Sequence, residues 1–403
     1  MRAAPTSRRL EIGRYDVASF LTYAIYAAGS VAIPVSLVAL ARQLGFSLEA
    51  GGLTAGGSLH LGRTAAMVVA MLACGFGAAR WGLRGTLGWA ILMMGAGMAM
   101  CAAAPSYGVA LLALAVAGMG EGVIEGLATP FVQALHPDEP GRYVNFSHAF
   151  WSVGVLVTVL AAGGLLSAGV SWRAITAGVG ALSLAPALLL LAPVRGGGGT
   201  QPASKAPPGA VWGHASGIIQ RPRFWRYFAA MFVAGGGEFC LTFWCASYIQ
   251  LHFAATAWSG GVGTACFAAG MAAGRVGWGY LVHQRGLRTL IIGSGVAGVA
   301  ITLLLPVTAG IVGFFAVLFL SGIATAPFWP SIQSYSADRL PDTDTTMLMI
   351  LLACAGVPGC GFFTWLMGLI GNHAGDLRLA FYLVPACFFV LTVLIATDGP
   401  ETK

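Results

Sequence analysis

Long apolar runs separated by short polar breaks constrain this chain more than any other feature. Twelve such runs follow one another along the 403 residues, interrupted at charged residues, prolines and glycines. A helix of about 20 mostly apolar residues is long enough to cross a bilayer. Only 9% of the residues are charged, whereas a soluble domain carries about 25% because its surface must meet water. The sequence therefore predicts an all-α polytopic membrane protein with twelve transmembrane helices.

The expected spans fall into two groups of six. In the first half they cover residues 16–41, 51–79, 86–104, 108–134, 143–166 and 173–192. In the second half they cover residues 224–251, 258–282, 288–305, 309–335, 346–371 and 377–397. We expect each boundary to be accurate only to several residues, because fraying and loop residues blur the ends of helices.

A polar stretch divides the two groups and has the composition of a flexible linker, with GGGGT at 196–200 and PP at 207–208. This predicts an N-terminal bundle at 1–192, a cytoplasmic linker at 193–223 and a C-terminal bundle at 224–403. The halves also resemble each other, since GFGAARWGLRGTL in the first is matched by GYLVHQRGLRTLI in the second. Repeated six-helix halves are typical of transporters built around a central site.

The distribution of lysine and arginine predicts the orientation, because these residues accumulate in cytoplasmic loops. With the N-terminus inside, three basic residues are outside the cell: Arg42, Arg173 and Arg378. Sixteen are cytoplasmic: Arg2, Arg8, Arg9, Arg14, Arg80, Arg84, Arg142, Arg195, Lys205, Arg221, Arg223, Arg226, Arg285, Arg288, Arg339 and Lys403. We therefore expect a multi-pass protein of the cell's inner membrane with both termini in the cytoplasm and the first span uncleaved.

Several functional classes find no support in the sequence. It contains no GxSxG, HExxH or GxxxxGK[ST] motif, so we expect no enzyme, no cofactor and no hydrolysis of ATP. The eight cysteines lie inside apolar runs without a metal-type CxxC pair, which predicts packing residues and no metal site. The net charge of +7 is not gathered into one patch, so no nucleic-acid partner is expected.

Acidic residues deep inside the spans are the sharpest functional signal, because a charge at the centre of a membrane helix is unfavourable by about 2.5–3.5 kcal/mol. Only Glu121, Glu125 and Glu238 of the 14 acidic residues lie there. Glu121 and Glu125 are four residues apart and share one helix face, so they are not expected to ionise together easily. Arg63, in the second span, is their natural partner. It either forms a structural or switching pair with one of them or binds an anionic part of the substrate.

Four further residues complete the expected site and gate. Glu238 follows three glycines that permit a local break in its helix, although close helix packing is the alternative. Asn145 and His148 lie three residues apart near the start of the fifth span and could line the cavity or relay protons. Arg275, near the cytoplasmic end of the eighth span, is expected to brace the gate.

The segment 75–87 resembles the GxLaDRxGRK loop motif of the major facilitator superfamily, at its usual place between the second and third spans. This resemblance, which covers the whole chain, implies the major facilitator fold and a gating role for Arg80, Gly82 and Arg84. The acid of the motif, which helps to latch the cytoplasmic gate, is replaced by Ala79.

Within the superfamily, the chain is similar to the sugar:proton symporters of the fucose permease type. Four segments carry this likeness: EGLATPFVQALHPDE (125–139), RYVNFSHAFWSVG (142–154), VAGGGEFCLTFWCASY (233–248) and GMAAGR (270–275). The resemblance supports Glu125 as a functional carboxylate. Two positions differ from the family pattern, since Thr129 replaces an asparagine and the aspartate of the first span falls near Ser30.

These observations together predict a monomeric secondary transporter in the lipid bilayer. It would move a sugar or another small polar organic solute together with a proton, using Glu125 and Glu121 tuned by Arg63. An exporter of amphipathic compounds by proton antiport is the chief alternative, and a membrane receptor that binds a ligand without moving it is the second. The direction of transport distinguishes the symporter from the exporter, and accumulation of the solute in liposomes excludes the receptor.

Overall fold

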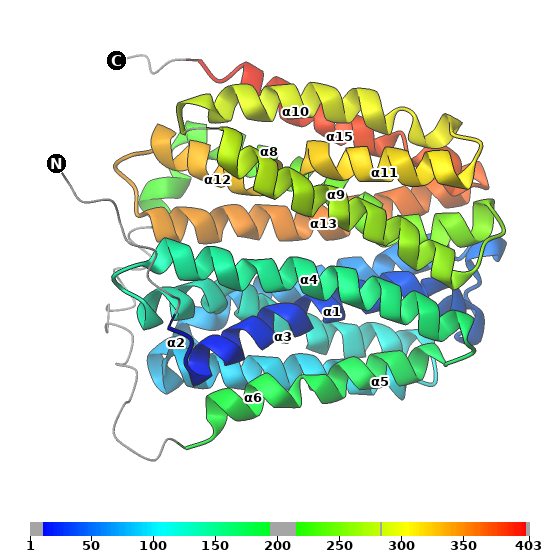
Figure 1. Ribbon diagram of the computed structural model, residues 1–403, viewed down its shortest axis with the longest axis horizontal. Coiled ribbons are helices and arrows are strands. Elements are labelled where there is room, and N and C mark those ends of the chain that lie inside the picture. The colour runs from blue at the N-terminus through cyan, green and yellow to red at the C-terminus, as the bar shows by residue number, and fades with distance from the viewer. Residues whose placement is uncertain (1–10, 194–214, 283, 400–403) are drawn as a thin grey trace.

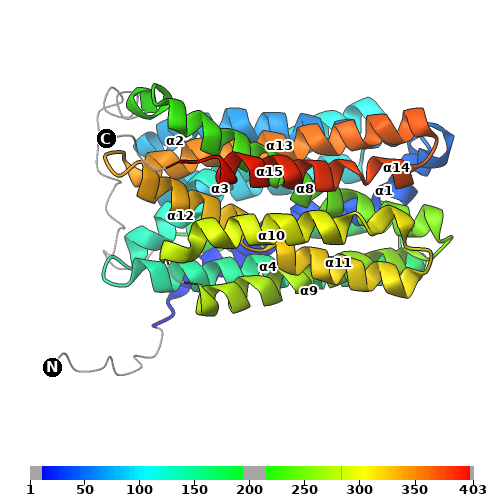
Figure 2. The ribbon, with the colours of Figure 1, turned by 90° about the horizontal axis from the view of Figure 1, so that it is seen from above.

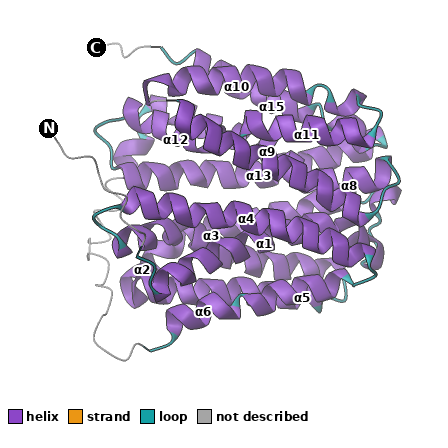
Figure 3. Ribbon diagram, viewed as in Figure 1, coloured by secondary structure: helices purple, strands orange, loops and turns teal. Residues whose placement is uncertain are grey.

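Helices make up the regular structure of the described part of the chain (Figure 3). A computed structural model describes residues 11–193, 215–282 and 284–399. The first half contains α1 (Arg14–Gln43), α2 (Leu53–Ala102), α3 (Tyr107–Leu135), α4 (Pro140–Ser167), α5 (Trp172–Leu182) and α6 (Leu184–Leu191). The second half contains α8 (Pro222–His252), α9 (Ala257–Leu281), α10 (Leu287–Thr302), α11 (Ile311–Thr325), α12 (Phe328–Arg339), α13 (Thr345–Ala374), α14 (Leu377–Ala380) and α15 (Leu383–Ala396).

The predicted twelve spans are confirmed to within a few residues. Ten helical stretches of the described residues are long and apolar enough to cross a membrane, with α2 counted once. However, α2 has 50 residues, or about 75 Å at 1.5 Å per residue, which exceeds the roughly 30 Å hydrocarbon core. It is interrupted at Gly82 (φ 70°, ψ 165°) and thus supplies the second and third spans. The 25 residues of α9 supply the eighth span.

Three of the spans consist of two shorter helices each. The sixth span is α5 and α6, which meet at Ser183. The tenth span is α11 and α12, where Pro327 precedes the second helix. The twelfth span is α14 and α15. Such breaks are tolerated within a membrane where neighbouring helices surround the freed backbone groups.

The helices run roughly side by side (Figures 1 and 2). In Figure 1, α1–α6 form a lower bundle and α8–α15 an upper one. We call the end where α1 and α8 begin and α6 and α15 end the termini end. Arg14 binds the backbone of α6 there, and Arg223 binds Asp398. The opposite end, where α2 and α9 begin and α4 and α13 end, is the far end. The helical residues 215–219 lie just before α8.

The bundles meet along two main helix pairs, α2 with α13 and α4 with α9. Helix α1 is the most enclosed of the ten membrane-crossing stretches, since 89% of its most apolar window is buried. It contacts α4 and α3 in its own bundle and α8 in the other. This central position places the polar side chains of α1 next to the space between the bundles.

Candidate functional site

Arg63 and Glu121 form a buried bidentate ion pair inside the N-terminal bundle. The Arg63 Nε donates to Glu121 Oε2 at 2.7 Å, and its Nη2 donates to the other carboxylate oxygen. Only 2% of Arg63 and 1% of Glu121 is exposed. The sequence left open whether Arg63 pairs with an acid or binds the substrate. The structure shows an ion pair with Glu121 that joins α2 to α3 and occupies the Arg63 guanidinium.

Glu125 lies one helical turn from Glu121 but has different surroundings. It is partly exposed, and the hydroxyl of the buried Tyr26 on α1 lies beside it. Cys354 and Cys360 of α13 lie near it on the other side of the interface. None of the ion pairs of the described residues involves Glu125. Glu125 is thus a carboxylate at the boundary between the bundles without a fixed counter-charge.

Three polar side chains near Glu125 form a triangle in which each lies within hydrogen-bonding distance of the other two. The Tyr23 hydroxyl lies 3.0 Å from Thr129 Oγ1 and 3.2 Å from His148 Nε2. The same Thr129 and His148 atoms are 3.1 Å apart. These residues come from α1, α3 and α4, and His148 is exposed. The triangle offers donors and acceptors that can be exchanged for those of a bound solute.

Asn145, predicted beside His148, lies on α4, but its side chain is outside the described part of the structure. Tyr23 and Tyr26 did not emerge from the sequence. Their spacing of three residues, with Ser30 four residues further, places all three on one face of α1. That periodic polar face inside an apolar span is the signal that could have revealed them.

Glu238 and Arg275 face each other in the C-terminal bundle. The Arg275 Nη2 lies 4.0 Å from Glu238 Oε1, and Glu238 is buried. The Arg275 guanidinium also lies 5.8 Å from the ring centroid of Trp151 on α4. Arg275 therefore links an acid of its own bundle to an aromatic side chain of the other, a cation–π contact between the bundles.

Of the two alternatives for the glycines before Glu238, the local helix break does not occur. Helix α8 runs without interruption from Pro222 to His252. The three glycines instead permit close packing, because a Cβ on Gly235 would lie 2.5 Å from the Gly356 carbonyl oxygen of α13. A Cβ on Gly236 would likewise collide with the Phe363 ring. The small residues were needed for contact with α13, which was the alternative interpretation.

A small pocket lies at the bundle interface around Arg275. Trp151, Ser152, Thr242, Thr264 and Arg275 supply its polar lining, from α4, α8 and α9. Its volume of about 20 Å³ holds about one water molecule. The two bundles are therefore in close contact at this height in the present conformation.

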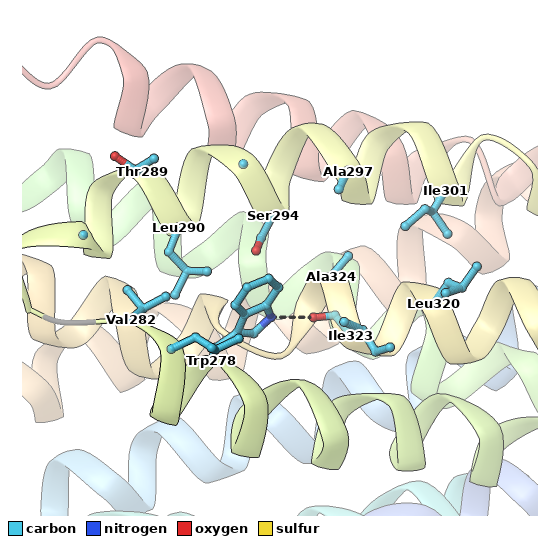
Figure 4. A pocket seen from close by; sticks show the side chains of 13 residues that line it. Trp278, Val282, Thr289, Leu290, Ser294, Ala297, Ile301, Leu320, Ile323 and Ala324 are labelled. Carbon is cyan, nitrogen blue, oxygen red and sulfur yellow. Dashed lines mark hydrogen bonds between the residues drawn. The ribbon is translucent and has the colours of Figure 1, made fainter.

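A larger pocket of about 740 Å³ lies elsewhere, between α9, α10 and α11 (Figure 4). Its walls are almost entirely apolar, and Trp278 donates a hydrogen bond to the Ile323 carbonyl within it. It contains none of the predicted site residues. Size alone does not make it the substrate site, because a polar solute needs convergent polar groups.

The loop motif contacts the N-terminal bundle itself. Gly82 has a φ of 70°, which favours glycine, and an added Cβ would meet no atom within 4 Å. Arg84 Nη1 donates to the Tyr15 hydroxyl on α1 at 2.6 Å. The Arg80 guanidinium lies over the ring of Trp81, 5.8 Å from its centroid. The local conformation thus suits the motif, and the gating role of these residues stays a prediction.

A cluster around Asp398 at the termini end was not foreseen. Its carboxylate accepts hydrogen bonds from the hydroxyls of Tyr227 (2.8 Å) and Tyr335 (2.7 Å) and from Arg223 Nε (3.0 Å). Burial raises the pKa of Asp398, but these hydrogen bonds and the charge of Arg223 outweigh it and leave the pKa below its ordinary value. The cluster ties the end of the chain to α8 and α12.

Within the described residues, no group of three or more histidine, cysteine or acidic side chains could hold a metal ion. The cysteines are free.

Comparisons with known proteins agree with this architecture. The sequence matches the profile of the Major Facilitator Superfamily over residues 19–286 and 246–403. A search of curated proteins gives no match. The fold is similar to the nucleoside transporter NupG (15% identity, 96% of this chain and 99% of that chain, TM-score 0.75). It is also similar to the E. coli fucose:proton symporter FucP (18%, 96% and 100%, 0.62) and to a D-xylose-proton symporter (13%, 97% and 98%, 0.74).

Because the family profile covers nearly the whole chain, the protein is a multi-pass membrane transporter and not an enzyme. It belongs to the major facilitator superfamily.

Proposed function

We propose that the protein carries a small polar organic solute, a sugar or sugar-like compound, across the inner membrane together with a proton. The observation that carries this proposal is the contrast between two neighbouring carboxylates. Glu121 is neutralised by Arg63 in a buried bidentate pair, whereas Glu125 belongs to none of the ion pairs of the described residues and has the neutral Tyr26 hydroxyl beside it. Proton binding to Glu125 changes the charge of the site without breaking an ion pair.

The surroundings of Glu125 suit a hydroxylated solute. The triangle of Tyr23, Thr129 and His148 presents two hydroxyls and an imidazole, each able to donate or to accept a hydrogen bond. Trp151 adds an aromatic face next to Arg275. The named substrates of the similar structures, a nucleoside, fucose and xylose, are compatible with such a lining and support this class of cargo.

Transport would proceed by alternating access of the site to the two sides of the membrane. The contacts of α2 with α13 and of α4 with α9 at the far end support a state closed on that side. The distribution of basic residues supports a cytoplasmic termini end. On this basis Glu125 binds a proton and the solute from outside, and both are released toward the cytoplasm by a protein that works as a monomer. Arg80, Gly82, Arg84 and Arg275 would act at the gate, and Glu238 would hold Arg275.

The test measures proton movement caused by solute in liposomes that contain the purified protein and a pH-sensitive dye. Native protein, Glu125→Gln and Glu139→Gln are compared with a panel of sugars, nucleosides and amphipathic compounds. Glu139 is the matched control, because it is exposed and paired with Arg142 at the start of α4. We expect a sugar or nucleoside to draw protons with it in native protein and in Glu139→Gln, but not in Glu125→Gln.

Three results would contradict the proposal. Proton movement opposite to amphipathic compounds, with no response to sugars or nucleosides, would indicate the exporter. Full coupling in Glu125→Gln would remove this carboxylate from the mechanism. A saturable ligand that is bound in detergent but never accumulated in liposomes would indicate a receptor.

A further inference from the structure

At the far end of the molecule, two contacts between the bundles share one design. In each, the last turn of a helix from one bundle supplies a polar side chain to the first turn of a helix in the other. The pairs are α13 with α2 and α4 with α9. The following inference rests on the alternating access proposed above.

Asn372, near the end of α13, caps the start of α2. The backbone N–H of Leu53, the first residue of α2, donates to Asn372 Oδ1 at 3.0 Å. The Asn372 Nδ2 in turn donates to the Gly51 carbonyl and to Thr54 Oγ1, each at 2.7 Å. The N-cap residue of α2, Gly52, has no side chain for this purpose. The first turn of a helix leaves its N–H groups without internal partners, and here the opposite bundle supplies one.

Ser167, the last residue of α4, does the same for α9. The backbone N–H of Trp258 in the first turn of α9 donates to Ser167 Oγ at 2.8 Å. The N–H of the next residue, Ser259, is capped within the bundle by Thr256. Helix α9 therefore divides its N-terminal donors between its own bundle and the other.

The two contacts are related by the internal repeat of the chain. Gly82 and Gly286, which match in the loop motif and its echo, are 204 positions apart. The first residues of α2 and α9, Leu53 and Ala257, have the same separation. The capping residues Ser167 and Asn372 are separated by 205 positions. Each bundle thus caps the equivalent helix of the other.

Close backbone packing accompanies both caps. A Cβ on Gly57 of α2 would lie 2.7 Å from the Trp365 Cα of α13. A Cβ on Gly261 of α9 would lie 2.4 Å from the Val159 carbonyl oxygen of α4. These glycines are again 204 positions apart. The helix pairs are therefore in contact immediately next to the caps.

We propose that Asn372 and Ser167 are positioning residues of the transport cycle, which latch the far end shut by capping helices of the opposite bundle. When the far end opens, the freed N–H groups meet water, so opening exchanges one hydrogen-bond partner for another. Such an exchange shifts the equilibrium between the far-closed and far-open states only moderately. A carrier that must open on every cycle requires a contact of this moderate strength. The latch stabilises the far-closed state and leaves the central site untouched.

The test measures the distance between spin labels at the far end of the two bundles. Ser106→Cys and Ala309→Cys place labels on exposed residues before α3 and α11. A Cys266→Ser background suits this labelling, because the other seven native cysteines are buried. Asn372→Ala and Ser167→Ala are compared with Ser171→Ala, whose hydroxyl caps α5 within a single bundle through Ala174 N–H.

We expect Asn372→Ala and Ser167→Ala each to raise the ratio of far-open to far-closed molecules about tenfold, equivalent to about 1.4 kcal/mol. Ser171→Ala should leave the ratio unchanged although it loses a helix cap as well. Thr54→Val removes one acceptor of Asn372 and should shift the ratio in the same direction. It provides a second test should Asn372→Ala fold poorly.

A wedge variant separates failure of the latch from failure of alternating access. Gly57→Trp forces a side chain between α2 and α13 and should populate the longer distance. If it does so while the Asn372 and Ser167 variants behave like Ser171→Ala, the latch is overturned and alternating access stands. If even the wedge gives only the short distance, the far end does not open, and both proposals fall.

Discussion

The buried pair of Arg63 and Glu121 allows a quantitative test of what holds the N-terminal bundle together. Both side chains are almost completely enclosed, and two hydrogen bonds join them. Removal of one partner leaves the other as an unpaired charge inside the membrane protein. Each of Glu121→Gln and Arg63→Met should therefore lower the free energy of unfolding by about 3–5 kcal/mol.

Replacement of both partners has a different expected outcome. In Arg63→Met/Glu121→Leu no charge is left unpaired, and apolar side chains of similar size occupy the space. Double replacements of buried pairs are often neutral or stabilising by about 1–4 kcal/mol. The double variant should thus be more stable than either single variant, although it carries more changes.

Reversible unfolding in mixed micelles, followed by the loss of helical signal, provides the assay. Glu125→Gln is the matched control, since Glu125 is the same residue type one turn away without an ion pair. It should change the free energy of unfolding by no more than about 1 kcal/mol. If the double variant is destabilised by the sum of the two single variants, or if Glu125→Gln is as damaging as Glu121→Gln, the reasoning about this pair is wrong.

Two further predictions concern the termini end. Gly82→Ala places a Cβ at a φ of 70° and should lower the free energy of unfolding by about 1–2 kcal/mol. The control is Gly75→Ala, which has an ordinary helical conformation with open space around it and should leave the stability unchanged. Equal melting temperatures of the two variants would contradict the argument. Asp398 has a lowered pKa in the folded protein, so its stabilising contribution is present above the unfolded pKa and is lost as the pH falls through the lower folded value. Asp398→Asn should therefore be less stable than native protein at pH 7, and the difference in melting temperature should narrow in acid; a difference that widens in acid would refute this sign.

The number and limits of the membrane spans were accessible from the sequence. Each apolar run must satisfy its own backbone hydrogen bonds inside the bilayer, so a local pattern determines a helix without knowledge of its neighbours. The local repeat likewise placed Gly82 at a turn between two spans, where a positive φ was later found. The sequence could not decide between a break and close packing at the glycines before Glu238, and the structure uses them for packing against α13.

Which side chain pairs with which other side chain was decided only by the tertiary structure. The spacing of Glu121 and Glu125 put both on one face of α3, but it could not say which of them meets Arg63. Gly118 decides the approach of α2 to α3, because a Cβ there would lie 2.3 Å from the Arg63 carbonyl oxygen. At this close distance the Arg63 side chain reaches Glu121, whereas Glu125 lies beside Tyr26 of α1.

The contacts between distant parts of the chain follow the same logic. Asn372 meets Leu53 across 319 positions, and Tyr227 meets Asp398 across 171. Whether a segment can cross the bilayer depends on the length of its own apolar run. The sequence by itself therefore determined the spans and the few acidic residues inside them. Which side chains face one another depends on how the helices pack, and packing is a property of pairs of surfaces that no single stretch of sequence contains.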